Sequence, residues 1–168
     1  TADRLVVEIL ADGSPVPPEH LDAPPADDPY ASEMQLRTAA AGPLVAESLM
    51  QACEAIDSIA PRHAEAAQLL QSGNVDDAMK QLAALMSTWQ QAQTVIDLAA
   101  AAPGVSLSSV PELDKAATEV VGRLNDMKEA LDRRDFSDLA DILIEDMPEM
   151  VDLWTGALRK AATNLAVA

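Results

Sequence analysis

Apolar side chains recur at every second position in two short stretches near the N-terminus, residues 4–11 and 33–39. A period of two is typical of a β-strand, in which every second side chain shares a face. Between the stretches lie an Asp12-Gly13 turn signal and six prolines, which cannot sustain a helix or donate a regular ladder of hydrogen bonds. The pattern predicts an N-terminal β-arm or hairpin with a Pro-rich loop over residues 1–42.

The pattern becomes helical after residue 42. Apolar side chains recur at steps of three and four through four long runs, at about 43–71, 74–102, 110–132 and 135–165. These steps place the apolar side chains along one stripe of each helix. Four stripes joined by short connections predict a mainly α fold, a four-helix up-down antiparallel bundle over residues 43–168.

Four residues mark where these helices should start or bend. Asn74 and Asp135 stand where an N-cap side chain would accept a hydrogen bond from a free backbone N–H. Pro61 and Pro148 fall inside predicted helices, and each removes one backbone donor. Because the apolar spacing continues through both prolines, we expect kinks there rather than chain reversals.

Composition supports the helical interpretation, and charge narrows the range of partners. Apolar residues make up 49% of the chain, whereas aromatic residues make up only 2%. This aromatic content is too low for a typical all-β fold. The formal net charge is −17, and no basic stripe interrupts the acidic excess. We therefore expect neither nucleic acid nor a membrane as partner. In the simplest interpretation, the negative charge keeps the protein soluble. In the alternative interpretation, it attracts a basic or amphipathic protein partner.

The single cysteine, Cys53, lies in an apolar helical run and cannot form an internal disulfide. No apolar run reaches the length that a transmembrane helix needs. Together these two features favour a cytoplasmic location, where thiols stay reduced.

The chain contains no known catalytic or metal-binding motif. Neither His20 nor His63 has an acidic residue three positions before it, as a dinuclear metal bundle would require. A Cys-x-x-Cys pair, a Gly-x-Ser-x-Gly elbow and a glycine-rich phosphate loop are also missing. We therefore expect no catalytic residue, no metal, no cofactor and no enzymatic activity, and no motif points to a known family.

Five acidic residues recur at helical spacing in the fourth predicted helix. Their spacing places them on one helix face, opposite the apolar stripe. They are Asp138, Asp141, Glu145, Glu149 and Asp152. We call this set the acidic stripe. It is a candidate surface for docking a basic partner, and the simpler interpretation is a solvated outer face.

Because the sequence lacks catalytic and metal-binding motifs and a basic surface for nucleic acid, it favours a non-enzymatic interaction protein. Examples are an adaptor, an assembly factor or a secretion-type chaperone. The alternative is a small enzyme or ligand sensor with a site between kinked helices. Such a site would lie near His63, with Glu54 and Asp57 on the same helix. The simpler interpretation makes His63 a structural residue of the core, close to the Pro61 kink.

The arm also predicts self-association. Leu5, Val7 and Ile9 would share one face of the first strand. Val6 and Leu10 would lie on the other face. A strand that is apolar on both faces is poorly suited to solvent, and a single hairpin has open edges. We expect a homodimer in which the arms pair or lie across the neighbouring subunit, with Leu5, Val7 and Ile9 as candidate contacts. The competing expectation folds the arm back onto its own helices.

Overall fold

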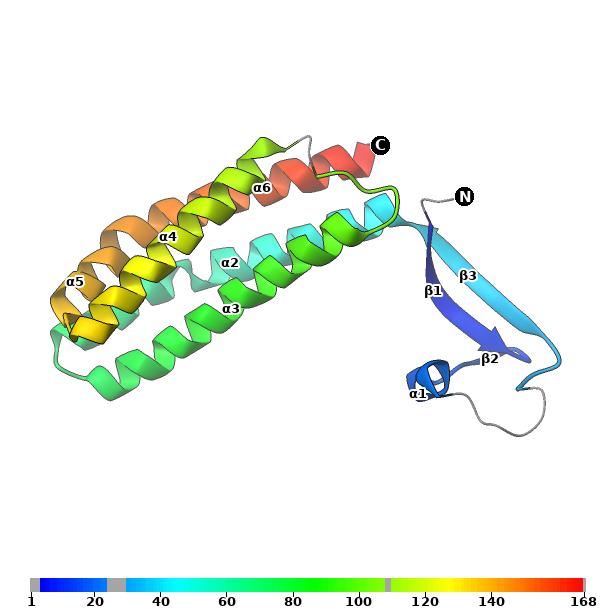
Figure 1. Cartoon of the computed structure of the whole chain (residues 1–168), viewed down its shortest axis with the longest axis horizontal. Helices are drawn as coiled ribbons and strands as arrows, with labels where there is room; N and C mark the ends of the chain where they lie inside the picture. The colour runs from blue at the N-terminus through cyan, green and yellow to red at the C-terminus, as the bar shows by residue number, and fades with distance from the viewer. Residues whose placement is uncertain (1–3, 24–29, 108–109, 168) are drawn as a thin grey trace.

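The N-terminal arm contains a small antiparallel sheet, and the rest of the chain is dominated by long helices (Figure 1). The computed structural model describes residues 4–23, 30–107 and 110–167. The hydrophobic pattern predicted a mainly helical chain with an N-terminal β-arm, and this level of the fold is confirmed.

Three strands form the sheet in the order β2-β1-β3. They are β1 (Arg4–Ala11), β2 (Ser14–Pro15) and β3 (Met34–Ala40), and a short helix, α1 (Pro18–Asp22), follows β2. The prediction that the Pro-rich segment sustains no helix is wrong at α1, because Pro18 occupies the first turn, where a helix needs no N–H donor. β1 pairs with both neighbours in the antiparallel sense. β3 therefore forms one edge of the sheet, and it leads directly into the first long helix.

Asp12 and Gly13 build the tight turn between β1 and β2, with φ angles of 47° and 83°. Two successive left-handed residues are typical of a type I′ hairpin, in which glycine carries no steric cost. The Asp12 carboxylate also accepts hydrogen bonds from the backbone N–H groups of Ser32 and Glu33, at 3.1 and 2.9 Å. One residue thus makes the turn and holds the start of β3 against it.

A β-bulge interrupts the pairing of β1 with β3 between Val6 and Glu8, and Val7 is the extra residue. An extra residue reverses the alternation of side chains beyond it. Leu5 and Ile9 consequently lie on opposite faces of the sheet. The expectation that Leu5, Val7 and Ile9 share one face is wrong, because it assumed a regular strand.

The long helices begin directly after β3. They are α2 (Ala41–Gln71), α3 (Val75–Ala101), α4 (Pro111–Arg133), α5 (Phe136–Asp141) and α6 (Met147–Val167), with a π-helical segment, η1 (Ile142–Asp146), between α5 and α6. The wide π turn ends two residues before Pro148, close to where the sequence predicted a disturbance of the helix. α2 runs through Pro61 as a single helix, so the chain does not reverse there, as predicted.

α2 is the central helix of the molecule, because it packs against α3, α5 and α6, while α4 packs against α5 and α6. Two buried tryptophans meet in the interior. Trp89 of α3 and Trp154 of α6 lie edge to face, with ring centroids 5.6 Å apart. The Trp154 indole N–H donates to the Ala116 carbonyl of α4 at 3.0 Å. These contacts join α3, α4 and α6 in one core.

The two predicted helix caps have different outcomes. The Asp135 side chain accepts the backbone N–H of Asp138 at 3.1 Å, as predicted for an N-cap. Asn74 stands at the N-cap position of α3, as predicted, but its side chain makes no capping hydrogen bond. Its amide donates instead to the Asp77 carboxylate at 3.0 Å, which also accepts from Lys80 at 2.7 Å.

Candidate functional site

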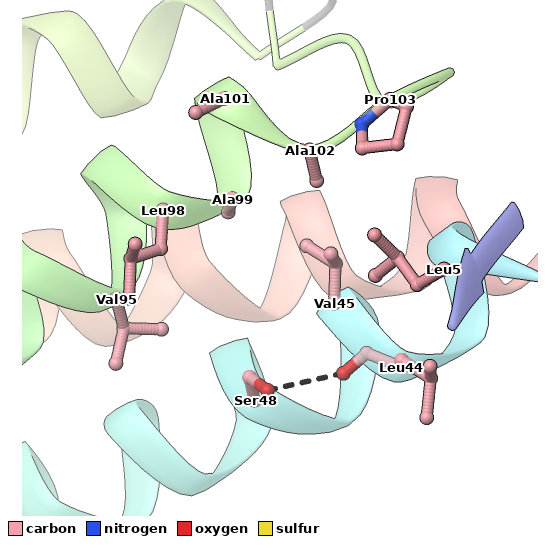
Figure 2. A pocket seen from close by; sticks show the side chains of 10 residues that line it. All are labelled: Leu5, Leu44, Val45, Ser48, Val95, Leu98, Ala99, Ala101, Ala102 and Pro103. Atoms are coloured by element: carbon pink, nitrogen blue, oxygen red, sulfur yellow. Dashed lines mark hydrogen bonds between the residues drawn. The ribbon is translucent and has the colours of Figure 1, made fainter. Parts of the chain in front are cut away.

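An apolar pocket lies where the arm meets the helices, and we call it the junction pocket (Figure 2). Its volume is about 410 Å³. β1, the start of α2, the end of α3 and the loop after α3 form its walls. The lining residues are Leu5, Leu44, Val45, Ser48, Val95, Leu98, Ala99, Ala101, Ala102 and Pro103.

Small side chains at the end of α3 leave this space open. Ala99, Ala101 and Ala102 each carry a single methyl group, and α3 ends just before Pro103, which has no N–H to continue it. β3 runs directly into α2, so its neighbour β1 is held beside the start of that helix and presents Leu5 to the pocket (Figure 2). The walls therefore come from segments that are far apart in the sequence.

The chemistry of the lining is almost entirely aliphatic. The lining contains no carboxylate, imidazole, amine or thiol. Its single polar side chain is Ser48, whose hydroxyl donates to the Leu44 carbonyl one helical turn earlier, at 3.1 Å (Figure 2). Leu98 is 67% exposed, so apolar surface extends to the mouth of the pocket. Such a surface gains free energy when another apolar group covers it.

Acidic residues adjoin the pocket. Glu47 on α2 and Asp97 on α3 are exposed, and each stands next to a lining residue. Residues 41–61 of α2 and 81–101 of α3 contain no lysine or arginine. Arg4 of β1 is engaged within the arm, where its guanidinium donates to a threonine of β3. The helical surface around the pocket is thus negative, which favours cationic neighbours.

The acidic stripe runs along α5, η1 and α6. Its exposed members are Asp141, Glu145, Glu149 and Asp152. Asp138 is half-buried and accepts from Arg133 at 2.8 Å, so one of the charges is already paired. The stripe is an exposed acidic surface, and none of its residues lines the junction pocket.

His63 is 1% exposed and lies in the helical core. Its Nδ1 is 3.3 Å from the Ala60 carbonyl oxygen, and its Nε2 accepts from the Trp89 indole N–H at 3.4 Å. Burial lowers the pKa of His63, because the imidazolium form would lose its hydration. The ring is therefore a neutral, hydrogen-bonded part of the core.

Glu54 and Asp57 stand on the solvent side of α2, and both are exposed. Asp57 forms an ion pair with Arg159 of α6. Because the His63 ring is buried while these carboxylates face solvent, the structure separates the three residues of the alternative ligand site.

Cys53 is also a core residue, with 1% exposure. Its Sγ lies 3.8 Å from the Thr155 carbonyl oxygen of α6. Burial raises the pKa of the Cys53 thiol, which disfavours the reactive thiolate. Cys53 is thus a packing residue between α2 and α6.

Within residues 4–23, 30–107 and 110–167, no group of three or more His, Cys, Asp or Glu side chains is arranged to hold a metal ion. Across the same ranges, no helix has both the length and the apolar character that crossing a membrane requires.

Hydrophobic periodicity did not reveal the junction pocket, because its walls belong to separate segments. Two signals were present in the sequence: the run of alanines at 99–102, and Leu98, which falls outside the apolar stripe of its helix. Neither signal shows that Leu5 lies close to the end of α3.

A family model described as "Domain of unknown function (DUF8042)" matches residues 47–156. The match covers more than half of the chain, so the chain belongs to this family. The matched region begins in α2 and ends in α6, which leaves the arm outside it. No curated protein and no solved structure matches the chain.

Proposed function

We propose that this member of the DUF8042 family is a non-enzymatic interaction protein, such as an adaptor, an assembly factor or a secretion-type chaperone, that holds an amphipathic partner at the junction pocket. The observation that supports the proposal is the lining of the pocket, which combines aliphatic side chains, an internally bonded Ser48 and an exposed Leu98. This lining gains free energy by excluding water, and it offers no acid, base or metal ligand for a reaction.

The proposed occupant is an aliphatic side chain carried by a basic amphipathic helix. Burial of a leucine-sized side chain contributes about 1.5–3 kcal/mol. Glu47 and Asp97 would attract lysines or arginines on either side of that residue, which raises the association rate and fixes orientation. A fatty acid or another anion fits less well, because the helical surface beside the pocket is negative.

The experiment compares two variants that place the same charge at positions of similar exposure. Leu98→Asp acts at the mouth of the pocket, whereas Val121→Asp acts on α4, where the valine is 58% exposed. The probe is a fluorescently labelled amphipathic helix of leucines and lysines, and binding is measured by anisotropy. We expect Leu98→Asp to weaken binding about tenfold or more and Val121→Asp to change it less than about twofold.

A second peptide, with serines in place of the leucines and the same lysines, separates pocket filling from charge attraction. We expect it to bind the unmodified chain at least about tenfold more weakly than the leucine peptide. Equal affinities of Leu98→Asp and Val121→Asp for the leucine peptide would remove the junction pocket from the proposed function.

We also propose the finer architecture and the setting expected from the sequence. The packing of α2 on α3 and α6, and of α4 on α6, supports a four-helix up-down antiparallel bundle. The single, buried Cys53 supports a cytoplasmic location. The net charge of −17 supports a protein partner rather than nucleic acid or an anionic membrane.

A further inference from the structure

β3 presents an open strand edge. The order β2-β1-β3 places it at one side of the sheet, and most of its side chains are exposed. In the part of the chain that the structure describes, no strand pairs with its outer side. An edge strand offers backbone N–H and C=O groups that a further strand can use.

The backbone groups of Met34 and Leu36 point toward this open edge. The Asp12 N–H donates to the Glu33 carbonyl at 2.9 Å, so Glu33 faces β1. Along an antiparallel strand, the backbone N–H and C=O groups of successive residues point to opposite sides. Those of residues 35 and 37 therefore point toward β1, and those of residues 34 and 36 point away from it. The carbonyl of Thr38 already accepts from an arginine of β1. The edge available for pairing is therefore centred on residues 34–36.

Apolar side chains at this edge are widely exposed. Met34 is 52% and Leu36 is 61% exposed, and Val6 on the same face of the sheet is 52% exposed. Native edge strands are usually protected by charge, proline or a covering segment. Cross-strand packing against another apolar pair would bury part of this surface.

We propose that β3 of a second copy occupies this edge, paired antiparallel about a two-fold axis through Gln35. In this register Met34 lies opposite the second copy's Leu36, and Glu33 lies opposite the second copy's Arg37. The axis repeats each contact, so the pairing forms two apolar pairs and two pairs of opposite charge. Each such cross-strand pair contributes roughly 0.2–1 kcal/mol.

Other two-fold registers lack this complementarity. An axis through Arg37 would place two arginines opposite each other, and an axis through Leu36 would set Glu33 against Ala39. Registers shifted by one residue would oppose outward-facing and inward-facing positions and lose hydrogen bonds. Arg37 already donates to Glu8 at 2.8 Å, and its remaining N–H groups can serve a second carboxylate.

This dimer goes beyond the partner site proposed above. It uses the outer edge of the arm, whereas the proposed partner site is the junction pocket, so either proposal can fail alone. It also moves the expected homodimer contact from Leu5, Val7 and Ile9 to residues 33–37. Leu5 serves the pocket instead.

Cysteine cross-linking tests the register in the full-length chain carrying Cys53→Ala. Gln35→Cys places two cysteines on the axis at a non-hydrogen-bonded pair, where Cβ atoms lie about 4.5–5.5 Å apart. Leu36→Cys is the matched control, because the two copies of position 36 are diagonal neighbours about 7–8 Å apart. After mild oxidation, we expect at least about fivefold more disulfide-linked dimer for Gln35→Cys than for Leu36→Cys.

Sedimentation velocity tests the dimer in chains that retain Cys53. We expect the unmodified chain and Leu98→Asp to sediment as dimers at tens of micromolar, roughly the range in which a useful dimer persists. Glu33→Arg and Arg37→Glu each oppose like charges and should shift the chain toward monomer, and the double variant should recover the dimer. A monomeric unmodified chain would overturn the proposal. Equal cross-linking at positions 35 and 36, or no recovery in the double variant, would overturn the register.

Discussion

At the scale of single residues, His63 shows how a polar side chain can occupy an apolar helical stripe. The Trp89 indole donates to its Nε2, so the ring proton is on Nδ1, where it can donate to the Ala60 carbonyl. The position of His63 in the apolar stripe of its helix predicted a core residue. The tryptophan partner could not be predicted, because it depends on how α2 and α3 pack side by side.

The stability of the protein should depend on pH through His63. In the unfolded chain the imidazole binds a proton below its ordinary pKa of about 6.5, whereas burial lowers the folded-state pKa. As the pH falls below about 6.5, the unfolded state binds more protons and the free energy of unfolding decreases. We predict that the unmodified chain loses stability relative to His63→Gln between about pH 7.5 and about pH 5 in urea denaturation.

The control for this measurement is His20→Gln, which removes the other histidine from the arm. Its stability should follow that of the unmodified chain across the same pH range. Parallel pH profiles for His63→Gln and the unmodified chain would show that His63 does not carry the effect.

At the scale of elements, hydrophobic spacing located β1, β3 and the long helices, but not β2, α1 or the irregularities within the elements. Apolar side chains at every second position predicted a strand over 4–11, and β1 spans these residues. The bulge at Val7 and the π turn over 142–146 each add one residue to a regular element. The added residue leaves the overall pattern of apolar and polar residues unchanged, so this pattern does not reveal it. Such irregularities follow from pairing and packing with other elements, which a single segment does not encode.

The π turn makes α5, η1 and α6 tolerant of a one-residue deletion. A π turn is an α-helix with one inserted residue, so removal of the exposed Ile144 should restore regular α-helical turns. The side chains after it would then keep their buried face. We predict a change in the free energy of unfolding of less than about 2 kcal/mol, measured by chemical denaturation.

Deletion of Val121 from α4 is the matched control. That helix has no π turn to absorb the loss, so the following residues would rotate by about 100° and move Met127 and Ala130 away from the core. We expect this deletion to cost more than about 4 kcal/mol or to prevent folding. Similar losses from both deletions would mean that η1 is needed for packing in its π form.

At the scale of the whole molecule, the arm and the helices contribute differently. The hydrophobic core cluster draws its buried residues from 45–165. The family match over 47–156 also lies within the helical part. In the described part of the arm, Leu10 is the buried apolar residue, and it stands outside that cluster. The helices therefore supply the core, while the arm contributes to both proposed binding surfaces, one at its open edge and one through Leu5.

This division predicts that a chain lacking residues 1–40 still folds. α2 begins at Ala41, and the deletion removes no member of the core cluster. We expect strong helical circular dichroism and cooperative thermal unfolding, with a Tm within about 5 °C of the intact chain, a shift of roughly 1 kcal/mol. Loss of cooperative unfolding would contradict the division, because it would make the arm part of the folding unit.

The same truncated chain should lose the dimer and bind the peptide more weakly, for different reasons. Removal of β3 takes away the strand edge, so we expect a monomer in sedimentation velocity where the intact chain is a dimer. Removal of Leu5 opens one wall of the junction pocket, so the leucine peptide should bind about three- to tenfold more weakly, in line with the partial loss of an apolar contact. A truncated chain that still dimerises would place the dimer contact on the helices. Unchanged peptide affinity would show that α2 and α3 form the binding surface without the arm.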